Sequence, residues 1–163
     1  MKRATIAILL TLALTYQVQS ISSMIHPVNG NIETKENPLK LAAMKTGLGD
    51  PGEKILNAIG IASKQTGLKE TFILALMFSE SSFKTHAVSK KQYKGLMQIP
   101  HAVYYEDANV LIGSRIFTEK LFLAKGDYRK AIVLYKGWSS DHPEGWRQAD
   151  KVLHISKRLE AHV

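Results

Sequence analysis

The chain lacks several features on which whole classes of function depend. It contains no cysteine, which excludes disulfides, thiolate metal ligands and a cysteine nucleophile. Its six histidines are scattered and none shows the spacing of a metal-ligand pair, so we expect neither a metal site nor a cofactor. No segment alternates apolar and polar residues in the way that marks a half-buried strand, so we expect little or no sheet.

What remains is the composition of an ordinary globular protein with a basic surface. The 163 residues are 45% hydrophobic and 22% charged, enough for one domain with a hydrophobic core and a short appendage. The formal net charge of +8 favours an anionic polymer as partner, either the bacterial cell wall or nucleic acid. Lys90, Lys91 and Lys94 form the only local cluster of lysines, and the chain has no nucleic-acid-binding motif, so we expect no nucleic acid partner.

The N-terminus has the pattern of an export signal. A positive start at Lys2 and Arg3 precedes an uncharged apolar run over 4–16, and small residues suit cleavage after Ser20. The run is shorter than the roughly 20 residues of a comfortable transmembrane helix, and an uncleaved membrane anchor is the alternative. We therefore expect an exported protein of the periplasm or cell envelope, with a signal peptide or short anchor over residues 1–20.

The remaining residues divide into an arm and a helical domain. Residues 21–48 mix Pro and Gly with polar residues, which predicts a linker or loosely packed arm with a short helix at 39–45. The domain is expected over 49–163, and its first helix would be capped by Asp50 and ended by Gly67. Further helices are expected over residues 69–80, 108–125 (capped by Asp107), 127–135 and 146–160. The fold class is therefore mostly all-α, and a substrate groove would lie between helices and loops.

One carboxylate stands out in this helical pattern. Glu80 ends an apolar helix, and Met77, Leu76 and Ile73 precede it by three, four and seven residues, so it lies on the face that should point to the core. Apolar neighbours and the negative end of the helix dipole both favour the protonated form of such an acid. A general acid for glycosidic bond cleavage needs that form. The alternative is a solvated glutamate at a helix end, with no chemical role.

Five short segments from Glu80 onward form an ordered pattern. They are Glu80-Ser81-Ser82-Phe83, Ala87-Val88-Ser89, Gly95-Leu96-Met97-Gln98-Ile99-Pro100, Asn109-Val110-Leu111-Ile112-Gly113 and Ala131-Ile132-Val133-Leu134-Tyr135-Lys136-Gly137. Together they resemble the soluble-type lytic transglycosylase (SLT) domain, which has a goose-lysozyme-like fold. The resemblance covers about residues 50–158 and implies a small, lysozyme-like helical domain with a substrate groove.

The resemblance also implies a substrate and a reaction. The substrate would be peptidoglycan, cut between N-acetylmuramic acid and N-acetylglucosamine. Glu80 would protonate the leaving oxygen and then act as base on the muramoyl 6-hydroxyl, which closes on the anomeric carbon and leaves a 1,6-anhydro end. The positions that match the family's substrate-contacting and groove-shaping residues are Ser89, Gly95, Met97, Gln98, Asn109 and Tyr135.

Several of the residues around this site also have structural alternatives. The Gln98 amide can bond to loop backbone, and Gly95 can serve a turn that requires positive φ. Tyr135 can be a core aromatic whose hydroxyl is satisfied. Trp138 and Trp146 can stack on sugar rings or pack between helices.

The chain has no second acid on a matching motif. Glycoside hydrolases ordinarily use two carboxylates, roughly 5 to 9.5 Å apart. A single acid suits an intramolecular nucleophile, because the sugar's own hydroxyl is held close and no water needs activation.

Two departures from the family pattern leave other functions open. Only ten residues separate Gln98 from Asn109, and Lys136 replaces the Asn that follows Tyr135 in the family. A trimmed groove suggests an enzyme that opens the wall locally for a secretion, conjugation or phage apparatus. A muramidase is the alternative within enzymes, and a non-catalytic wall-binding or assembly module with a degenerate site is the alternative outside them. We expect a monomer.

Overall fold

The computed structural model describes residues 36–100 and 105–163, and residues 36–163 form one compact unit. The predicted signal segment 1–20 and residues 21–35 of the predicted arm lie outside the described residues. The helices are α2 (Pro38–Lys45), α3 (Glu53–Thr66), α4 (Glu70–Ser81), α5 (Glu106–Leu123), α6 (Tyr128–Tyr135) and α7 (Pro143–Glu160). The described residues contain only two isolated β-bridges besides these helices, which confirms the mostly all-α fold. No helix among them is long and apolar enough to span a membrane.

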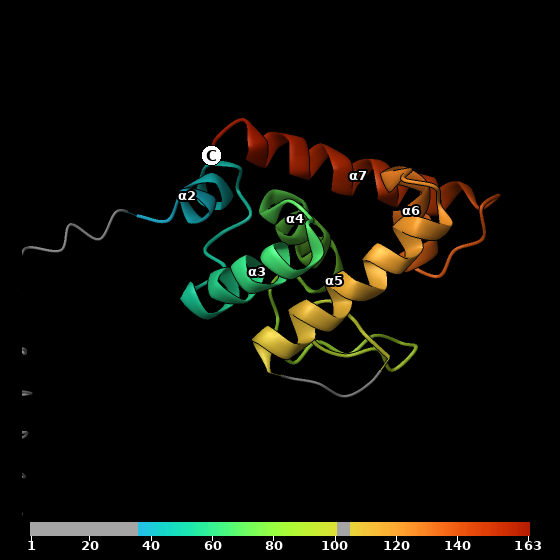
Figure 1. Cartoon of the computed structure of the whole chain (residues 1–163), viewed down its shortest axis with the longest axis horizontal. Helices are drawn as coiled ribbons and strands as arrows, with labels where there is room; N and C mark the ends of the chain where they lie inside the picture. Colours follow the sequence, from blue (N-terminus) through green and yellow to red (C-terminus); the bar gives the residue numbers. More distant parts are fainter. Residues whose placement is uncertain (1–35, 101–104) are drawn as a thin grey trace, which may run out of the picture. The chain divides into compact units, whose positions relative to one another are not determined.

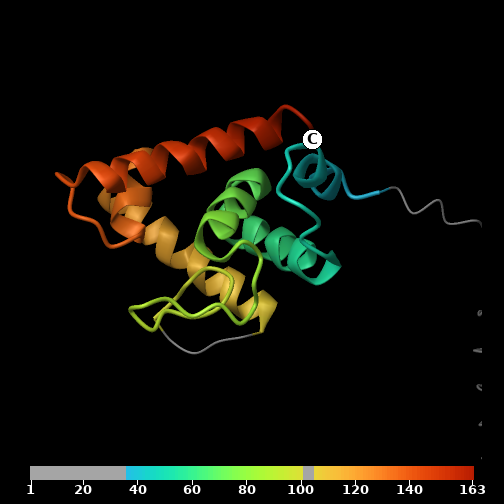
Figure 2. The same cartoon turned by 180° about the vertical axis from the view of Figure 1, so that it is seen from behind.

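Helix α4 lies at the centre of the molecule. It packs against α7 and α3, and Figures 1 and 2 show it enclosed between them. All residues from Thr71 to Met77 are buried, so the helix is covered on nearly every side rather than along a single stripe. The end of α4, where Glu80 lies, is therefore held in place by the core.

An aromatic cluster joins α4 to the two helices on the other side of the site. The ring of Phe72 lies 4.6 Å from that of Phe117 on α5 and 4.9 Å from that of Tyr128 on α6, between ring centroids. Phe117 also lies 5.9 Å from Tyr135. Aromatic pairs at these distances stabilise packing beyond the burial of apolar area, so this cluster holds α4, α5 and α6 together.

Helix ends follow their sequence signals at some positions and not at others. Gly67 is the left-handed C-cap of α3, and the Asp127 side chain accepts from Lys130 N at the start of α6, both as predicted. The prediction that Asp50 caps α3 is wrong: Gly52 occupies the cap at φ 82°, and Asp50 accepts from Gly52 N instead. An aspartate carboxylate can accept a hydrogen bond from the backbone N–H two residues later, and this local bond competes with its use as a helix cap.

Two further helices begin earlier than predicted. Helix α5 starts at Glu106 with Tyr105 as its N-cap, so Asp107 lies inside the first turn rather than at the cap. Helix α7 starts at Pro143 rather than near Trp146, because a proline suits the first turn, where no backbone N–H needs a partner.

The short helix predicted at 39–45 is present as α2, but it is not loosely packed. Its Leu39, Ala42 and Ala43 are buried, and it contacts α7. Arg158 of α7 donates to the Thr46 carbonyl at 2.9 Å, at the end of α2. The compact unit therefore begins at Glu36, inside the range predicted as an arm.

Candidate functional site

A cavity of about 580 Å³ lies where the end of α4, the loop 82–100 and the end of α6 meet the first half of α7. Its volume falls within the roughly 300–1,000 Å³ of ligand sites. The residues that line it are Glu80, Ser89, Lys90, Lys91, Tyr93, Gln98, Tyr135, Lys136, Trp138 and Gln148. Four of the seven predicted site residues are thus brought together from three segments: Glu80, Ser89, Gln98 and Tyr135.

A second, smaller cavity extends the first. It measures about 270 Å³ and shares Tyr93, Gln98 and Tyr135 with its neighbour. It continues past these residues to Pro100 and to Ile116 of α5. We call the two adjoining cavities the groove; Glu80 lines only the larger of them.

Glu80 lies at the last turn of α4, and its side chain is only 13% exposed. The helix ends directly after it, since Ser82 and Phe83 take the left-handed conformation with φ of 51° and 65°. Non-glycine residues rarely adopt this conformation, so the turn beside the acid is strained.

The carboxylate of Glu80 is not surrounded by apolar groups alone. Lys136, at the C-cap of α6, donates from Nζ to Glu80 Oε1 at 2.7 Å, and its own side chain is 7% exposed. The expectation of apolar surroundings for Glu80 is therefore incomplete, because the nearly buried ammonium of Lys136 lies against its carboxylate. The sequence identifies Lys136 as a departure from the family pattern, but not as the partner of the acid.

The other predicted residues support the cavity from behind. Tyr135 donates from its hydroxyl to the Met97 carbonyl at 2.7 Å, and Met97 N donates to Asn109 Oδ1 at 2.8 Å. Asn109 Nδ2 in turn donates to the Lys94 carbonyl at 3.2 Å. Met97 and Asn109 are buried and do not line the cavity. They fix the loop 82–100 against α5 and α6, so their role is to position the residues that do line it.

Two glycines make this close packing possible. A Cβ at Gly95, where φ is 80°, would overlap the Asn109 side chain. A Cβ at Gly113 on α5 would overlap Met97 and lie 3.1 Å from the Tyr135 hydroxyl. Both sites need a residue without a side chain, because the loop and the helix approach too closely for any other.

The polar side chains of the loop are partly used by the loop itself. Gln98 has φ 48°, and its Nε2 donates to the carbonyls of Ala87 and Gly95 at 3.1 and 2.8 Å. Ser89 Oγ accepts from Tyr93 N at 3.0 Å. The NH₂ group of Gln98 therefore bonds to loop backbone, as the structural alternative predicted, although the residue also lines the cavity.

Tyr135 stays a hydrogen-bond donor at all ordinary pH values. Burial raises the pKa of its phenol well above the usual value, and the negative charge of Glu80 raises it further. The neutral hydroxyl donates its one hydrogen bond to the Met97 carbonyl, and its oxygen can still accept a hydrogen bond from a ligand.

The two tryptophans differ in role. Trp138 lines the cavity, and its ring lies 4.2 Å from that of His142, between centroids. Trp146 donates to the Ser140 carbonyl and packs under the Arg129 guanidinium, away from the cavity lining. Only Trp138 is placed to stack on a sugar.

Four lining residues, Lys90, Lys91, Tyr93 and Gln148, were not predicted as part of the site. Lys90 and Lys91 are exposed loop lysines, and Gln148 faces the cavity from α7. Only the contact between the loop and the two C-terminal helices brings these residues to Glu80.

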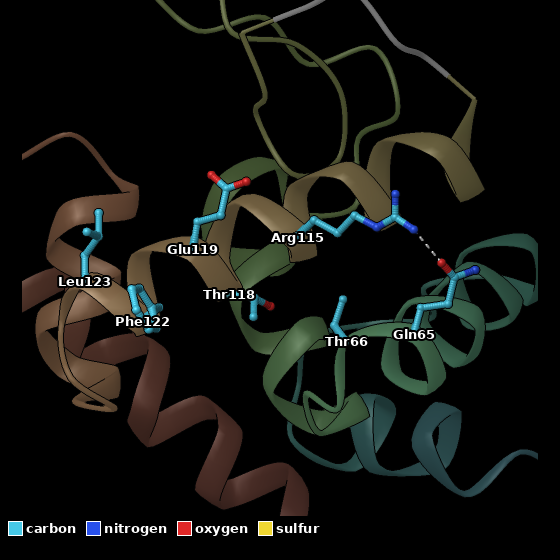
Figure 3. Close-up of a pocket in the computed structure, with 7 residues that line it drawn as sticks. All are labelled: Gln65, Thr66, Arg115, Thr118, Glu119, Phe122 and Leu123. Atoms are coloured by element: carbon cyan, nitrogen blue, oxygen red, sulfur yellow. Dashed lines mark hydrogen bonds between the residues drawn. The ribbon is translucent and has the colours of Figure 1, made fainter.

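A separate cavity of about 590 Å³ lies between the end of α3 and α5 (Figure 3). Arg115 reaches across it and donates to the Gln65 side chain at 2.8 Å. Phe122 and Leu123 give it an apolar edge, with 84% and 62% exposure. It holds none of the predicted site residues. Within the described part of the chain, no cluster of three or more potential metal ligands is present in either cavity or elsewhere.

Comparison with known proteins identifies one family. Residues 57–122 match the family model described as the transglycosylase SLT domain, which confirms the predicted resemblance over this segment. The matched segment contains Glu80 and the loop, and it ends before Tyr135 and Lys136. No curated protein and no solved structure matches the chain.

Proposed function

Because residues 57–122 match the transglycosylase SLT domain, we propose that the chain is a lytic transglycosylase that cuts the MurNAc–GlcNAc bond of peptidoglycan. The observation that carries the proposal is Glu80, a nearly buried carboxylate that lines the groove. Ser89, Gln98 and Tyr135 line the same cavity and offer hydrogen-bonding groups to a sugar.

The mechanism follows from the number of carboxylates in the groove. Among the described residues that line its two cavities, Glu80 is the only acid. A hydrolase of the two-carboxylate kind would need a second acid to activate water or to attack the sugar. With one acid, the proposed nucleophile is the muramoyl 6-hydroxyl, which the substrate itself holds near the anomeric carbon.

In this scheme Glu80 acts twice. In its protonated form it gives a proton to the leaving oxygen of N-acetylglucosamine, and the glycosidic bond breaks. It then takes a proton from the 6-hydroxyl as that oxygen bonds to the anomeric carbon. The proton count of Glu80 is restored at the end, and no water is consumed.

The Lys136–Glu80 ion pair favours a second candidate function, a non-catalytic module that binds the wall or assists an assembly. An acid in an ion pair has no proton to give, and a nearby ammonium opposes the positive charge of an oxocarbenium-like transition state. Such a module would bind sacculi without releasing fragments. The catalytic proposal therefore requires that substrate separates Lys136 from Glu80.

The test is digestion of purified peptidoglycan followed by mass analysis of the soluble products. The proposal predicts anhydro-muropeptides from the wild-type chain and none from Glu80→Gln, which replaces the acid with an amide of the same shape. Products that carry an added water would make the chain a muramidase. Equal binding by both variants without release would favour the non-catalytic module.

The cellular setting is part of the proposal. The basic charge and the export-like N-terminus support action as a monomer in the periplasm or cell envelope. The short span between Gln98 and Asn109 supports service to a secretion, conjugation or phage apparatus. N-terminal sequencing of the exported chain tests the setting: a start at Ile21 indicates a cleaved signal peptide, and a retained Met1 indicates an anchor.

A further inference from the structure

The cavity around Glu80 carries more positive than negative charge. Its charged and titratable lining groups are Glu80, Lys90, Lys91, Tyr93, Tyr135 and Lys136. Three of them are lysines and one is a carboxylate, so a ligand that fills the cavity meets a surplus of ammonium groups. A purely neutral sugar chain offers no counter-charge to these lysines.

Lys91 and Lys136 approach the end of α6 in different ways: Lys91 brings its ammonium there, and Lys136 starts from it with its backbone. Lys136 is the C-cap of α6, and a Cβ built on the next residue, Gly137, would lie 3.7 Å from Lys91 Nζ. Lys91 belongs to the loop 82–100, and Lys136 points from the helix end to Glu80. A small anion in the cavity between Glu80 and the end of α6 would meet lysines from both segments.

Lys136 has the capacity to bind Glu80 and a ligand in turn. An ammonium offers three donors, and one of those on Lys136 is given to Glu80 Oε1. Its flexible four-carbon stem starts at the C-cap, directly after the last residue of α6. A ligand carboxylate that enters the cavity beside Glu80 would compete with Glu80 for this ammonium.

We propose that Lys136 is a specificity-determining residue that recognises a carboxylate on the substrate and, by moving to it, releases Glu80. This inference rests on the proposed function, because peptidoglycan supplies such carboxylates in two places: the stem peptide and the lactyl group of a muramoyl residue without peptide. Glu80, no longer held by the ammonium, is then free to face the leaving oxygen of the substrate. A chitin chain has no carboxylate, so it would leave the ion pair between Lys136 and Glu80 intact.

The experiment measures binding rather than cleavage, at low ionic strength, by calorimetry. The probes are a tetrasaccharide muropeptide with free carboxylates, the same muropeptide with its carboxylates blocked as methylamides, a peptide-free muramoyl tetrasaccharide with its lactyl carboxylate, and chitotetraose. The first and third probes separate the two sources of carboxylate, and the second is the blocked control. The variants are Lys136→Met, Glu80→Gln, the double variant with both changes, and Lys64→Met as control at an exposed lysine of α3 outside the cavity.

The wild type is expected to bind a free-carboxylate probe only a few-fold more tightly than the blocked one, because the bond from Lys136 to Glu80 is given up for the new one. In Glu80→Gln, where no such bond is lost, the preference should approach about tenfold, as for one charged hydrogen bond. Lys136→Met should abolish this preference, and so should the double variant, which leaves no lone charge and guards against misfolding. Glu80→Gln should strengthen the preference, because Lys136 then has no competing carboxylate, and Lys64→Met should keep it.

Three results would overturn the inference: no preference in the wild type, a preference that survives in Lys136→Met, or one that Glu80→Gln leaves unchanged or weakens. Each is independent of catalysis. If wild-type digestion releases no fragments while the Lys136-dependent preference is present, the catalytic proposal fails and this inference stands. The opposite pattern rejects the inference and keeps the enzyme.

Discussion

The ion pair between Lys136 and Glu80 makes a quantitative prediction about stability. The two side chains are 7% and 13% exposed, and their charged atoms lie 2.7 Å apart. Removal of one partner of such a pair leaves the other charge nearly buried and alone, at a cost of about 3 kcal/mol. Lys136→Met should therefore lower the free energy of unfolding by about 3 kcal/mol, and the melting temperature by about 10 °C.

The double variant Glu80→Gln/Lys136→Met should recover most of this loss, because no unpaired charge remains. We expect it within about 1 kcal/mol of the wild type, so that the coupling energy from the four proteins is about 2 kcal/mol or more. Urea unfolding near neutral pH, with and without 1 M salt, measures all four. The coupling should change little with salt, since buried pairs are screened weakly.

A surface pair provides the matched control for this cycle. Arg129 and Asp150 form an ion pair whose side chains are 46% and 55% exposed, and its coupling should fall near the error of the measurement. A coupling for Lys136 and Glu80 that is equally small would refute the reasoning. It would mean that the pair does not form in solution and that Glu80 needs no release.

The remaining predictions concern the packing behind the groove. Gly95→Ala should destabilise the chain by about 2 kcal/mol or more in urea unfolding, since its Cβ would overlap Asn109. The control Gly126→Ala, at φ 84° with open space around it, should cost only about 1 kcal/mol. Equal costs for the two variants would contradict the close approach of Gly95 to Asn109. Tyr135→Phe should lose about 1 kcal/mol, because the Met97 carbonyl keeps no donor from residue 135, and digestion assays should show slower cleavage; wild-type rate and stability would contradict this. The raised pKa of Tyr135 predicts a contribution to stability that is present below pH 10 and is lost as pH rises through the pKa of Tyr135 in the folded chain. Ultraviolet titration should find one of the six tyrosines still protonated beyond pH 10 until the chain unfolds. If all the tyrosines titrate normally in the folded chain, this prediction is contradicted.

Local signals account for most of what could be predicted from the sequence. Gly67 and Asp127 set helix ends through their own backbone and side-chain preferences, and the order of motifs from Glu80 to Gln98 indicated a shared site. These features depend on neighbours within a few residues. Asp50 does not cap α3 because its side chain forms a local bond of another kind, with the backbone N–H of Gly52.

The partner of the acid could not be predicted, because it depends on tertiary structure. Lys136 lies 56 residues after Glu80, and the two meet only because α4 and α6 end at the same place. The same holds for Met97, which the motif suggested as groove floor but which proves to be a buried link between Asn109 and Tyr135. Periodicity indicated that Glu80 faces the interior, but not which charges it meets there.

In the proposed function, Glu80 acts as the one acid and base on a substrate that supplies its own nucleophile. Digestion of peptidoglycan by the wild-type chain in water labelled with heavy oxygen tests this directly. The prediction is soluble fragments with anhydro ends that contain no label, and no fragments from Glu80→Gln. Labelled reducing ends, or unlabelled fragments from Glu80→Gln, would contradict it.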